Sequence, residues 1–341
     1  MKFDFCIGNP PYQDNTTGEN ETYSPPVYDR FMDASFSVAD RIELIHPARF
    51  LFNAGSTPKA WNEKMLNDSH LKVLEYHEDA TDVFANTDIK GGIVITYYDK
   101  TREFHPIEIF TKYVELNSIL EKIITQNKNG WIGQIVYIQN RFVLSVLLSD
   151  YPNYKSSIGS DGKDSRFEKN IFEKIPLFME TPFSDSVRTI GIFNGKRTWR
   201  YIDIKYVDDK HENLTFYKVV IPVANGSGEF GQALSTPIIE KPNEAYTRSF
   251  IGIGAFKTES EAANCCKYIK TKFTRTMLHI LKVTQMANKD VWRYVPLQDF
   301  TDKSDIDWMK TVHEIDLQLY KKYGLSDDEI KFIETHVKEM E

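Results

Sequence analysis

The sequence predicts an α/β fold in its first third, followed by an α+β region and a helical tail. Strand and helix patterns alternate over residues 1–108, which is typical of α/β domains. Four strand-like runs and a long helical pattern lie between residues 109 and 300. Two helix patterns with capping signals fill residues 301–341. We therefore predict domains at 1–108, 109–300 and 301–341.

The composition is that of a soluble globular protein. The chain has 341 residues, of which 41% are hydrophobic and 27% charged. No apolar run approaches the roughly 18 residues of a membrane span. Cys6, Cys265 and Cys266 have no metal-ligand spacing, so we read them as reduced thiols. We expect a cytoplasmic protein with no metal site and no membrane partner.

The elements of the first third follow from apolar periodicity and from proline positions. The pattern predicts strands at Phe3–Ile7, Arg41–Pro47, Leu71–His77 and Gly92–Tyr98, and helices at Val27–Ala39 and Thr57–Asn67. Pro47 stops the second strand, and Pro58 suits the first turn of a helix.

The remaining elements follow from the same signals. The pattern predicts a helix at Leu116–Asn127, strands at Thr189–Phe193, Trp199–Val207, Phe216–Val223 and Arg248–Phe256, and one long helix from the capping box at Thr258 and Glu261 to about Lys282. In the tail, Ser304 or Asp305 is predicted to cap a helix that Gly324 ends. A second capping box at Ser326 and Glu329 opens the last helix.

A short motif, Asn9-Pro10-Pro11-Tyr12, comes directly after the first predicted strand. Its two prolines prevent helix formation and sheet pairing, so the loop is stiff. It offers the Asn9 amide, the Pro10 carbonyl and the Tyr12 ring. A fixed pair of acceptors beside an aromatic face suits a planar base with an exocyclic amine. The alternative is a strand followed by a turn without chemistry.

This tetrapeptide resembles motif IV of the S-adenosylmethionine-dependent amino-methyltransferases, and its Asn is similar to the N6-adenine DNA type of restriction–modification systems. The resemblance implies that the Asn9 side-chain oxygen and the Pro10 carbonyl accept hydrogen bonds from the adenine amine, while Tyr12 stacks on a flipped base. It also implies double-stranded DNA as partner and S-adenosylmethionine as cofactor, with Asn9 at the edge of the cofactor site.

The resemblance extends along the first third of the chain. Arg41–Phe52 is similar to the next strand and loop of the family, and Leu71–Tyr98 to its closing hairpin. Residues 1–108 would then be the C-terminal half of a Rossmann-like methyltransferase sheet. Phe84 lies where family members place a second aromatic against the flipped base. The alternative for Phe84 is a core aromatic under a loop.

The family's cofactor motif is the part of the pattern that this sequence does not show. Family members bind the cofactor with a strand–Gly-x-Gly–helix unit and an acidic residue ahead of motif IV. We find neither, and expect residues 1–341 to need a further N-terminal methyltransferase or nuclease segment or subunit for activity. Asn225–Gly231 is rejected as a substitute because Pro237 and Pro242 follow it. Ser249–Gly254 precedes a helix and stays an alternative.

Basic residues concentrate in one part of a chain whose net charge is −7. Residues 241–293 carry ten Lys and Arg against four Asp and Glu. The stretch 272–296 is similar to the end of the target-recognition domain in restriction–modification adenine methyltransferases. We predict DNA contacts from Lys196, Arg197, Arg200, Lys272, Arg275 and Lys282. The alternative is a solvated helix face.

Other functions stay open at this point. Asp185 with Asp203 and Lys205, or Asp82 with Asp88 and Lys90, mimics the Asp…Asp-x-Lys sites of restriction nucleases. The Asn-Pro-Pro-Tyr motif also occurs in enzymes that methylate protein glutamine or rRNA. A binding protein without catalysis is a third possibility. The large C-terminal region with a basic block favours DNA.

Overall fold

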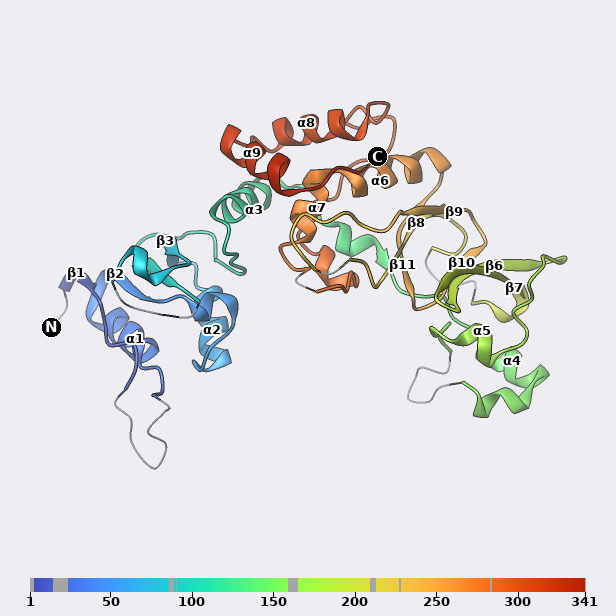
Figure 1. Ribbon diagram of the computed structural model, residues 1–341, viewed down its shortest axis with the longest axis horizontal. Coiled ribbons are helices and arrows are strands. Elements are labelled where there is room, and N and C mark those ends of the chain that lie inside the picture. Colours follow the sequence, from blue (N-terminus) through green and yellow to red (C-terminus); the bar gives the residue numbers. More distant parts are fainter. Residues whose placement is uncertain are drawn as a thin grey trace. The chain divides into compact units, whose positions relative to one another are not determined.

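A computed structural model describes residues 3–14, 24–85, 89, 91–158, 165–208, 213–226, 228–282 and 284–340. The chain divides into two compact units, unit 1 (residues 1–121) and unit 2 (residues 122–341) (Figure 1). The three-domain division expected from the sequence stays a prediction, and each unit is described by itself below.

Unit 1 is built on a four-stranded sheet with the order β1-β2-β4-β3. Its strands are β1 (Phe3–Gly8), β2 (Ala39–Pro47), β3 (Leu71–His77) and β4 (Ile93–Asp99). Strand β1 pairs in parallel with β2, whereas β4 runs antiparallel to both β2 and β3. All four strands lie within one or two residues of the predicted ranges, because their apolar runs are bounded by turns and prolines.

Two helices, α1 (Tyr28–Val38) and α2 (Lys59–Leu66), cover one face of this sheet. Met32 from α1 and Met65 from α2 are fully buried against Leu44 and Val94. Short 3-10 turns, η1 (Arg49–Phe52) and η2 (Ala80–Asp82), follow β2 and β3. Apolar residues at alternate positions of β2 therefore face the helices and form the core of unit 1.

The C-terminal ends of β1, β2 and β3 lie at the same end of the sheet, so the loops that follow these strands lie there too. His77 and Pro47 both pair with Ile93, and Gly8 pairs with Leu44 close to the end of β2. In open α/β sheets, ligands bind outside the carboxyl ends of the parallel strands. The Asn9–Tyr12 loop and the loop that carries Phe84 both lie at this end of the sheet.

Unit 2 contains two further sheets, with the orders β10-β6-β7 and β5-β11-β8-β9. The strands are β5 (Val136–Tyr137), β6 (Ser186–Phe193), β7 (Lys196–Asp203), β8 (Tyr217–Pro222), β9 (Ile238–Glu240), β10 (Glu244–Tyr246) and β11 (Phe250–Phe256). The mixed α/β class predicted from the sequence is therefore confirmed, with three small sheets.

Helices and 3-10 turns complete unit 2 (Figure 1). They are η3 (Ile132–Ile135), α4 (Leu144–Asp150), η4 (Pro152–Ser156), α5 (Ile171–Lys174), η5 (Ile204–Tyr206), α6 (Glu259–Lys270), α7 (Lys272–Leu278), η6 (Lys289–Trp292), α8 (Val312–Lys322) and α9 (Asp327–His336). Helix α3 (Val114–Gln126) crosses the boundary between the units.

Two helix predictions were wrong in their boundaries. The single helix expected from Thr258 to Lys282 is broken at Thr271, whose side chain caps α7 by accepting from the N–H of Thr274 at 3.1 Å. The first tail helix begins with a capping box at Thr311 and Glu314 rather than at Ser304 or Asp305. The predicted capping box at Ser326 is confirmed. None of the described helices is long and apolar enough to cross a membrane.

Candidate active site

The Asn9–Tyr12 loop begins where β1 ends and is fastened to the segment before α1. The N–H of Val27 donates to the Tyr12 carbonyl at 3.2 Å, and the N–H of Asp14 donates to the Pro25 carbonyl at 2.9 Å. In the described part of the chain nothing donates a hydrogen bond to the Pro10 carbonyl. The prolines and these two backbone bonds fix the loop, which leaves the Pro10 acceptor available.

The structure brings the side chains of Asn9 and Tyr12 together. Asn9 is exposed and Tyr12 is half-buried. Burial raises the pKa of the Tyr12 phenol, and the adjacent Asn9 side chain partly offsets that rise. The Tyr12 hydroxyl oxygen is buried near the Asn9 side chain but forms no well-aligned hydrogen bond among the described residues. An uncharged ring next to an exposed amide is the arrangement that an amine-bearing base would require.

A stack of rings that the sequence did not predict lies next to the segment that holds this loop. His46, at the end of β2, stacks on Tyr28 with ring centroids 5.7 Å apart, and its Nε2 lies 2.8 Å from the Thr96 hydroxyl. Burial lowers the pKa of His46 to about 4, so the imidazole is neutral at pH 7. Because Tyr28 opens α1 directly after Val27, the stack supports the segment that holds the Tyr12 backbone. The His46-Pro47 pair at a strand end was the available sequence signal.

A second polar network holds the loop after β2. The Thr57 hydroxyl donates to Asn62 Oδ1 at 2.7 Å, and Asn62 Nδ2 donates to Asn53 Oδ1 at 3.3 Å. Asn53 has a φ of 50°, a left-handed conformation that asparagine tolerates better than most residues. Arg49 packs its stem so closely on Gly91 that a Cβ there would lie 2.9 Å from Arg49 Cγ. Arg49 thus joins the loop after β2 to the loop between β3 and β4.

Phe84 lies on that β3–β4 loop, just after η2. Its N–H donates to the Ala80 carbonyl at 2.9 Å, and its side chain is half-buried. Phe84 is not among the described residues that make up or line the core of unit 1. Its predicted stacking role stays a prediction. Asp88 and Lys90, from one nuclease alternative, lie outside the described residues.

In unit 2, three predicted DNA contacts lie on the β6–β7 hairpin (Figure 1). Lys196 is exposed beside the turn at Asn194 and Gly195, whose φ values are 49° and 73°. These values match the two-residue turns that join twisted antiparallel strands. Arg197 donates to the Thr236 carbonyl at 2.9 Å. Arg200 lies over the Phe193 ring and forms an ion pair with an exposed carboxylate, Glu180, at 2.6 Å.

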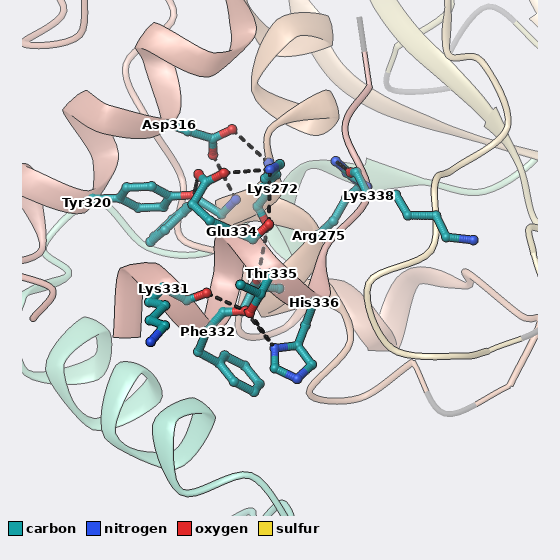
Figure 2. Close-up of polar contacts among 12 residues, drawn as sticks. Lys272, Arg275, Asp316, Tyr320, Lys331, Phe332, Glu334, Thr335, His336 and Lys338 are labelled. Carbon is teal, nitrogen blue, oxygen red and sulfur yellow. Dashed lines mark hydrogen bonds and ion pairs between the residues drawn. The ribbon is translucent and has the colours of Figure 1, made fainter. Parts of the chain in front are cut away.

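The predicted exposed basic face of the long helix is wrong for Lys272 and Arg275 (Figure 2). Lys272 forms an ion pair with Glu334 at 2.5 Å, and its side chain is only 12% exposed. Arg275 is fully buried and donates to the carbonyls of Lys270, Gln232 and Lys338. Because these donors are used inside unit 2, Lys272 and Arg275 are not available as phosphate contacts.

Lys282 differs from these two residues. It follows α7 and is also buried, with 1% of its surface exposed, so it does not lie on an open helix face either. Its Nζ, however, has no hydrogen-bond partner in the described part of the chain.

The other nuclease alternative, Asp185 with Asp203 and Lys205, does not form a metal site among the described residues. The Lys205 ammonium binds Asp150 at 2.9 Å, and the Asp203 carboxylate accepts from the Lys205 N–H at 3.0 Å. Asp185 lies next to Asp203 at the end of the hairpin, with its carbonyl 2.8 Å from the N–H of Ile204. No group of three or more His, Cys, Asp and Glu side chains suited to a metal ion occurs among the described residues.

The internal alternative for a cofactor turn, Ser249–Gly254, is also wrong. These residues lie mainly in β11, which runs antiparallel to both β5 and β8. A Cβ on Gly252 would lie 2.5 Å from the Tyr246 hydroxyl, so this glycine serves the packing of the sheet. The turn from β11 into α6 comes only after it, at Lys257 and Thr258, and contains no glycine.

Comparison with known proteins agrees with the N-terminal motif. Residues 1–84 match the family described as Eco57I restriction-modification methylase. An uncharacterized adenine-specific methylase of Mycoplasma pneumoniae is 30% identical over 95 residues, which cover 27% of this chain and 22% of the relative. The resemblance predicted from Asn9-Pro10-Pro11-Tyr12 is confirmed by these matches.

Two solved structures are similar over most of this chain at low identity. The type IIG restriction endonuclease BpuSI gives a TM-score of 0.35 at 10% identity, covering 92% of this chain and 48% of BpuSI. The type IIL restriction-modification enzyme MmeI, solved in complex with DNA, gives 0.34 at 10% identity, covering 97% and 56%. This chain spans about half the length of both.

Proposed function

We propose that this chain carries the amine site and the DNA-recognition part of an N6-adenine DNA methyltransferase of a restriction–modification system. One observation carries the proposal. Asn9-Pro10-Pro11-Tyr12 stands at the carboxyl end of β1, within a segment that matches restriction-modification methylases. The strand order β1-β2-β4-β3 supports our inference that unit 1 is the C-terminal half of a methyltransferase sheet.

The proposed chemistry rests on two acceptors and one ring. The Asn9 side-chain oxygen and the Pro10 carbonyl would accept the two N–H bonds of the adenine amine. This would concentrate the nitrogen lone pair away from the ring and stabilise the positive charge that develops on nitrogen during attack. Tyr12 would stack on the extruded base and hold the amine in line, which lowers the entropic part of the barrier.

S-adenosylmethionine is the proposed methyl donor, and when bound it supplies an electrophilic methyl group. Asn9 is exposed at the end of β1, which fits the methyl side of such a site. The Tyr12 hydroxyl, buried near the Asn9 side chain, is a further polar group beside it. We assign no described residue to the nucleoside or the carboxylate of the cofactor.

Double-stranded DNA is the proposed partner of unit 2. Lys196 is exposed near the turn of the hairpin, and Arg197 is half-buried. The Arg200 side chain is only 15% exposed, but its partner Glu180 is exposed, so a phosphate would have to replace that carboxylate. A two-stranded ribbon fits a DNA groove. We assign positioning contacts to phosphates, since such contacts set register and need no base edge.

Replacing Asn9 with Ala tests the amine site. The test uses a cofactor-competent form, with any further segment supplied in trans. We expect the activation free energy to rise by about 3 kcal/mol, the scale of one lost transition-state hydrogen bond, which lowers turnover roughly a hundredfold. Duplex affinity should change little because Asn9 makes no phosphate contact in this proposal. Methyl transfer to adenine is measured with labelled cofactor. Wild-type turnover in Asn9→Ala would refute the assignment, and Asn117→Ala serves as a control outside the site.

A further inference from the structure

A buried lysine without a counter-ion lies under a glycine-rich loop of unit 2. Lys282 is 1% exposed, and its Nζ has no hydrogen-bond partner among the described residues. Burial lowers the pKa of the Lys282 ammonium, and no described carboxylate acts on it in the opposite direction. A buried charge without a partner is costly, so such groups are found paired with an ion of opposite sign or in the neutral form.

The loop against this segment carries a free donor of its own. Asn225 is 1% exposed, and its Oδ1 accepts from the N–H of Ser235 at 2.7 Å. This bond fixes the orientation of the amide, so Nδ2 is the group left over. Nδ2 is buried with no partner in the described chain. The N–H groups of Gly226 and Gly228 likewise have no acceptor among the described residues.

The loop contacts the Lys282 segment on both sides of the lysine. Before it, the Phe230 and His279 rings lie 5.7 Å apart. After it, the N–H of Asn225 donates to the Gln285 carbonyl at 2.8 Å. A Cβ on Gly228 would lie 2.7 Å from Thr284 Cα, so the backbone of the loop packs directly on the segment. The loop therefore packs on the segment on both sides of the buried Lys282.

The electrostatic surroundings are positive. Burial, together with the nearby charges of Lys282 and Arg275, lowers the pKa of His279 to about 4, so this imidazole is neutral at pH 7. Arg275 is itself buried and bonded to carbonyl oxygens. Two buried cations, Lys282 and Arg275, thus lie near the neutral His279 beside a loop whose edge, at Gly226, Thr284 and Gln285, is open to solvent.

We propose that Lys282, the Asn225 amide and the N–H groups of Gly226 and Gly228 form a binding site for a phosphate group. Glycine-rich backbone with free N–H groups and an adjacent lysine is the donor set that recognises phosphate in other proteins. The group is a phosphodiester of DNA or a free phosphate, and the experiments below separate the two. This site does not depend on methyl transfer.

Thermal unfolding of the full chain with inorganic phosphate, against sodium chloride of equal ionic strength, tests the site. Wild-type protein should gain melting temperature with phosphate concentration, because a ligand that binds only the folded state stabilises it. Lys282→Met should lose this response and melt at the same or a higher temperature without phosphate, since it removes an unpaired buried charge. Lys289→Met, an exposed lysine on the same segment, should respond like the wild type.

A second variant keeps the test decisive if Lys282→Met fails to fold. Asn225→Asp retains the acceptor for Ser235 and turns the free amide into a carboxylate, which would repel phosphate and supply Lys282 with an internal counter-ion. Its melting temperature should be higher than that of the wild type and should not change with phosphate concentration. Equal phosphate responses in the wild type and either variant, or no response in the wild type beyond that of chloride, would overturn the proposal.

Duplex binding separates the two sources of the phosphate. If a DNA phosphodiester occupies the site, Lys282→Met should reduce the slope of log affinity against log salt by about one, and inorganic phosphate should compete with DNA. If free phosphate occupies the site, Lys282→Met should show the same salt slope as the wild type, and only the wild type should show the rise in melting temperature with phosphate. If the wild type showed the expected phosphate responses but transferred no methyl group to adenine, the phosphate site would stand and only the proposed function would be contradicted.

Discussion

Phe84 is a half-buried aromatic on a loop at the same end of the sheet as Asn9 and Tyr12. Core aromatics of unit 1, such as Phe50, are instead fully buried and packed against Trp61. A ring outside the core has surface left for a ligand. The position of Phe84 therefore suits the stacking role that the family resemblance implies.

Replacing Phe84 with Ala should weaken binding to a duplex with a mismatched target adenine by about 1–3 kcal/mol, the range of one base–aromatic stack. The melting temperature should change little. The control is Phe50→Ala, which empties a core site and should cost about 3–5 kcal/mol of stability. A large drop in melting temperature for Phe84→Ala, with unchanged DNA affinity, would place Phe84 in the core instead.

Glu240 in unit 2 gives a pH prediction. It is 1% exposed, and burial, together with its neighbour Glu244, raises the pKa of Glu240 to about 8. Trp199 donates to it, Arg188 pairs with Glu244, and Lys218 is buried on the adjacent strand. Because the folded state holds a proton that the unfolded state releases above its ordinary pKa, this group makes stability fall as pH rises from about 4.5 to 8.

Glu240→Gln imitates the protonated acid and should remove that dependence. Its melting temperature should exceed that of the wild type by more at pH 7.5 than at pH 5. Glu173→Gln, an exposed carboxylate in the same unit, should show no such difference. Differential scanning calorimetry at both pH values measures it. Parallel wild-type and Glu240→Gln curves would contradict the assignment.

At the scale of elements, the β6–β7 hairpin has eight consecutive residue pairs and an exposed tip. Arg200 lies over Phe193 and Arg188 over Trp199, so aromatic rings hold cations on both faces of the ribbon. A rigid two-stranded ribbon with cations near its turn can enter a groove without reorganisation. It is the element of unit 2 that we expect to contact DNA first.

Replacing Lys196, Arg197 and Arg200 with Gln should lower the salt slope of duplex binding by about one unit for each lost phosphate contact. The matched control replaces the exposed cations Lys155, Lys169 and Lys174 and should leave the slope unchanged. Fluorescence anisotropy across a salt series measures both. Equal slopes in the hairpin variant and the wild type would remove this hairpin from the interface.

At the scale of the whole molecule, β1 stands at one end of its sheet and pairs only with β2 in the described chain. Phe3, Phe5 and Ile7 are 51%, 52% and 73% exposed on the face away from α1. An apolar edge strand with unpaired backbone groups is a template for another strand. This surface sets how the purified chain behaves in solution.

We expect the purified chain to self-associate through β1 as its concentration rises. Ile7→Lys should suppress the association, because a charge at a strand edge opposes pairing. Met309→Lys, which changes an 89% exposed apolar residue in unit 2, should not. Sedimentation velocity at several concentrations compares them. A wild-type chain that stays monomeric throughout, or an Ile7→Lys variant that associates equally, would contradict the expectation.

The sequence by itself determined the strands of unit 1 and the Asn9–Tyr12 loop. Apolar runs bounded by prolines and glycines have few local alternatives, and a Pro-Pro pair fixes its own backbone. Tertiary structure alone decided which cations are available. Lys272 and Arg275 read as a basic helix face, yet the helix is interrupted at Thr271, and the carboxylate of Asp316 adds to the Thr271 cap by accepting from the N–H groups of Lys272 and Phe273. The Thr271 cap is local, but the Asp316 contact comes from 44 residues away, and no local pattern encodes it.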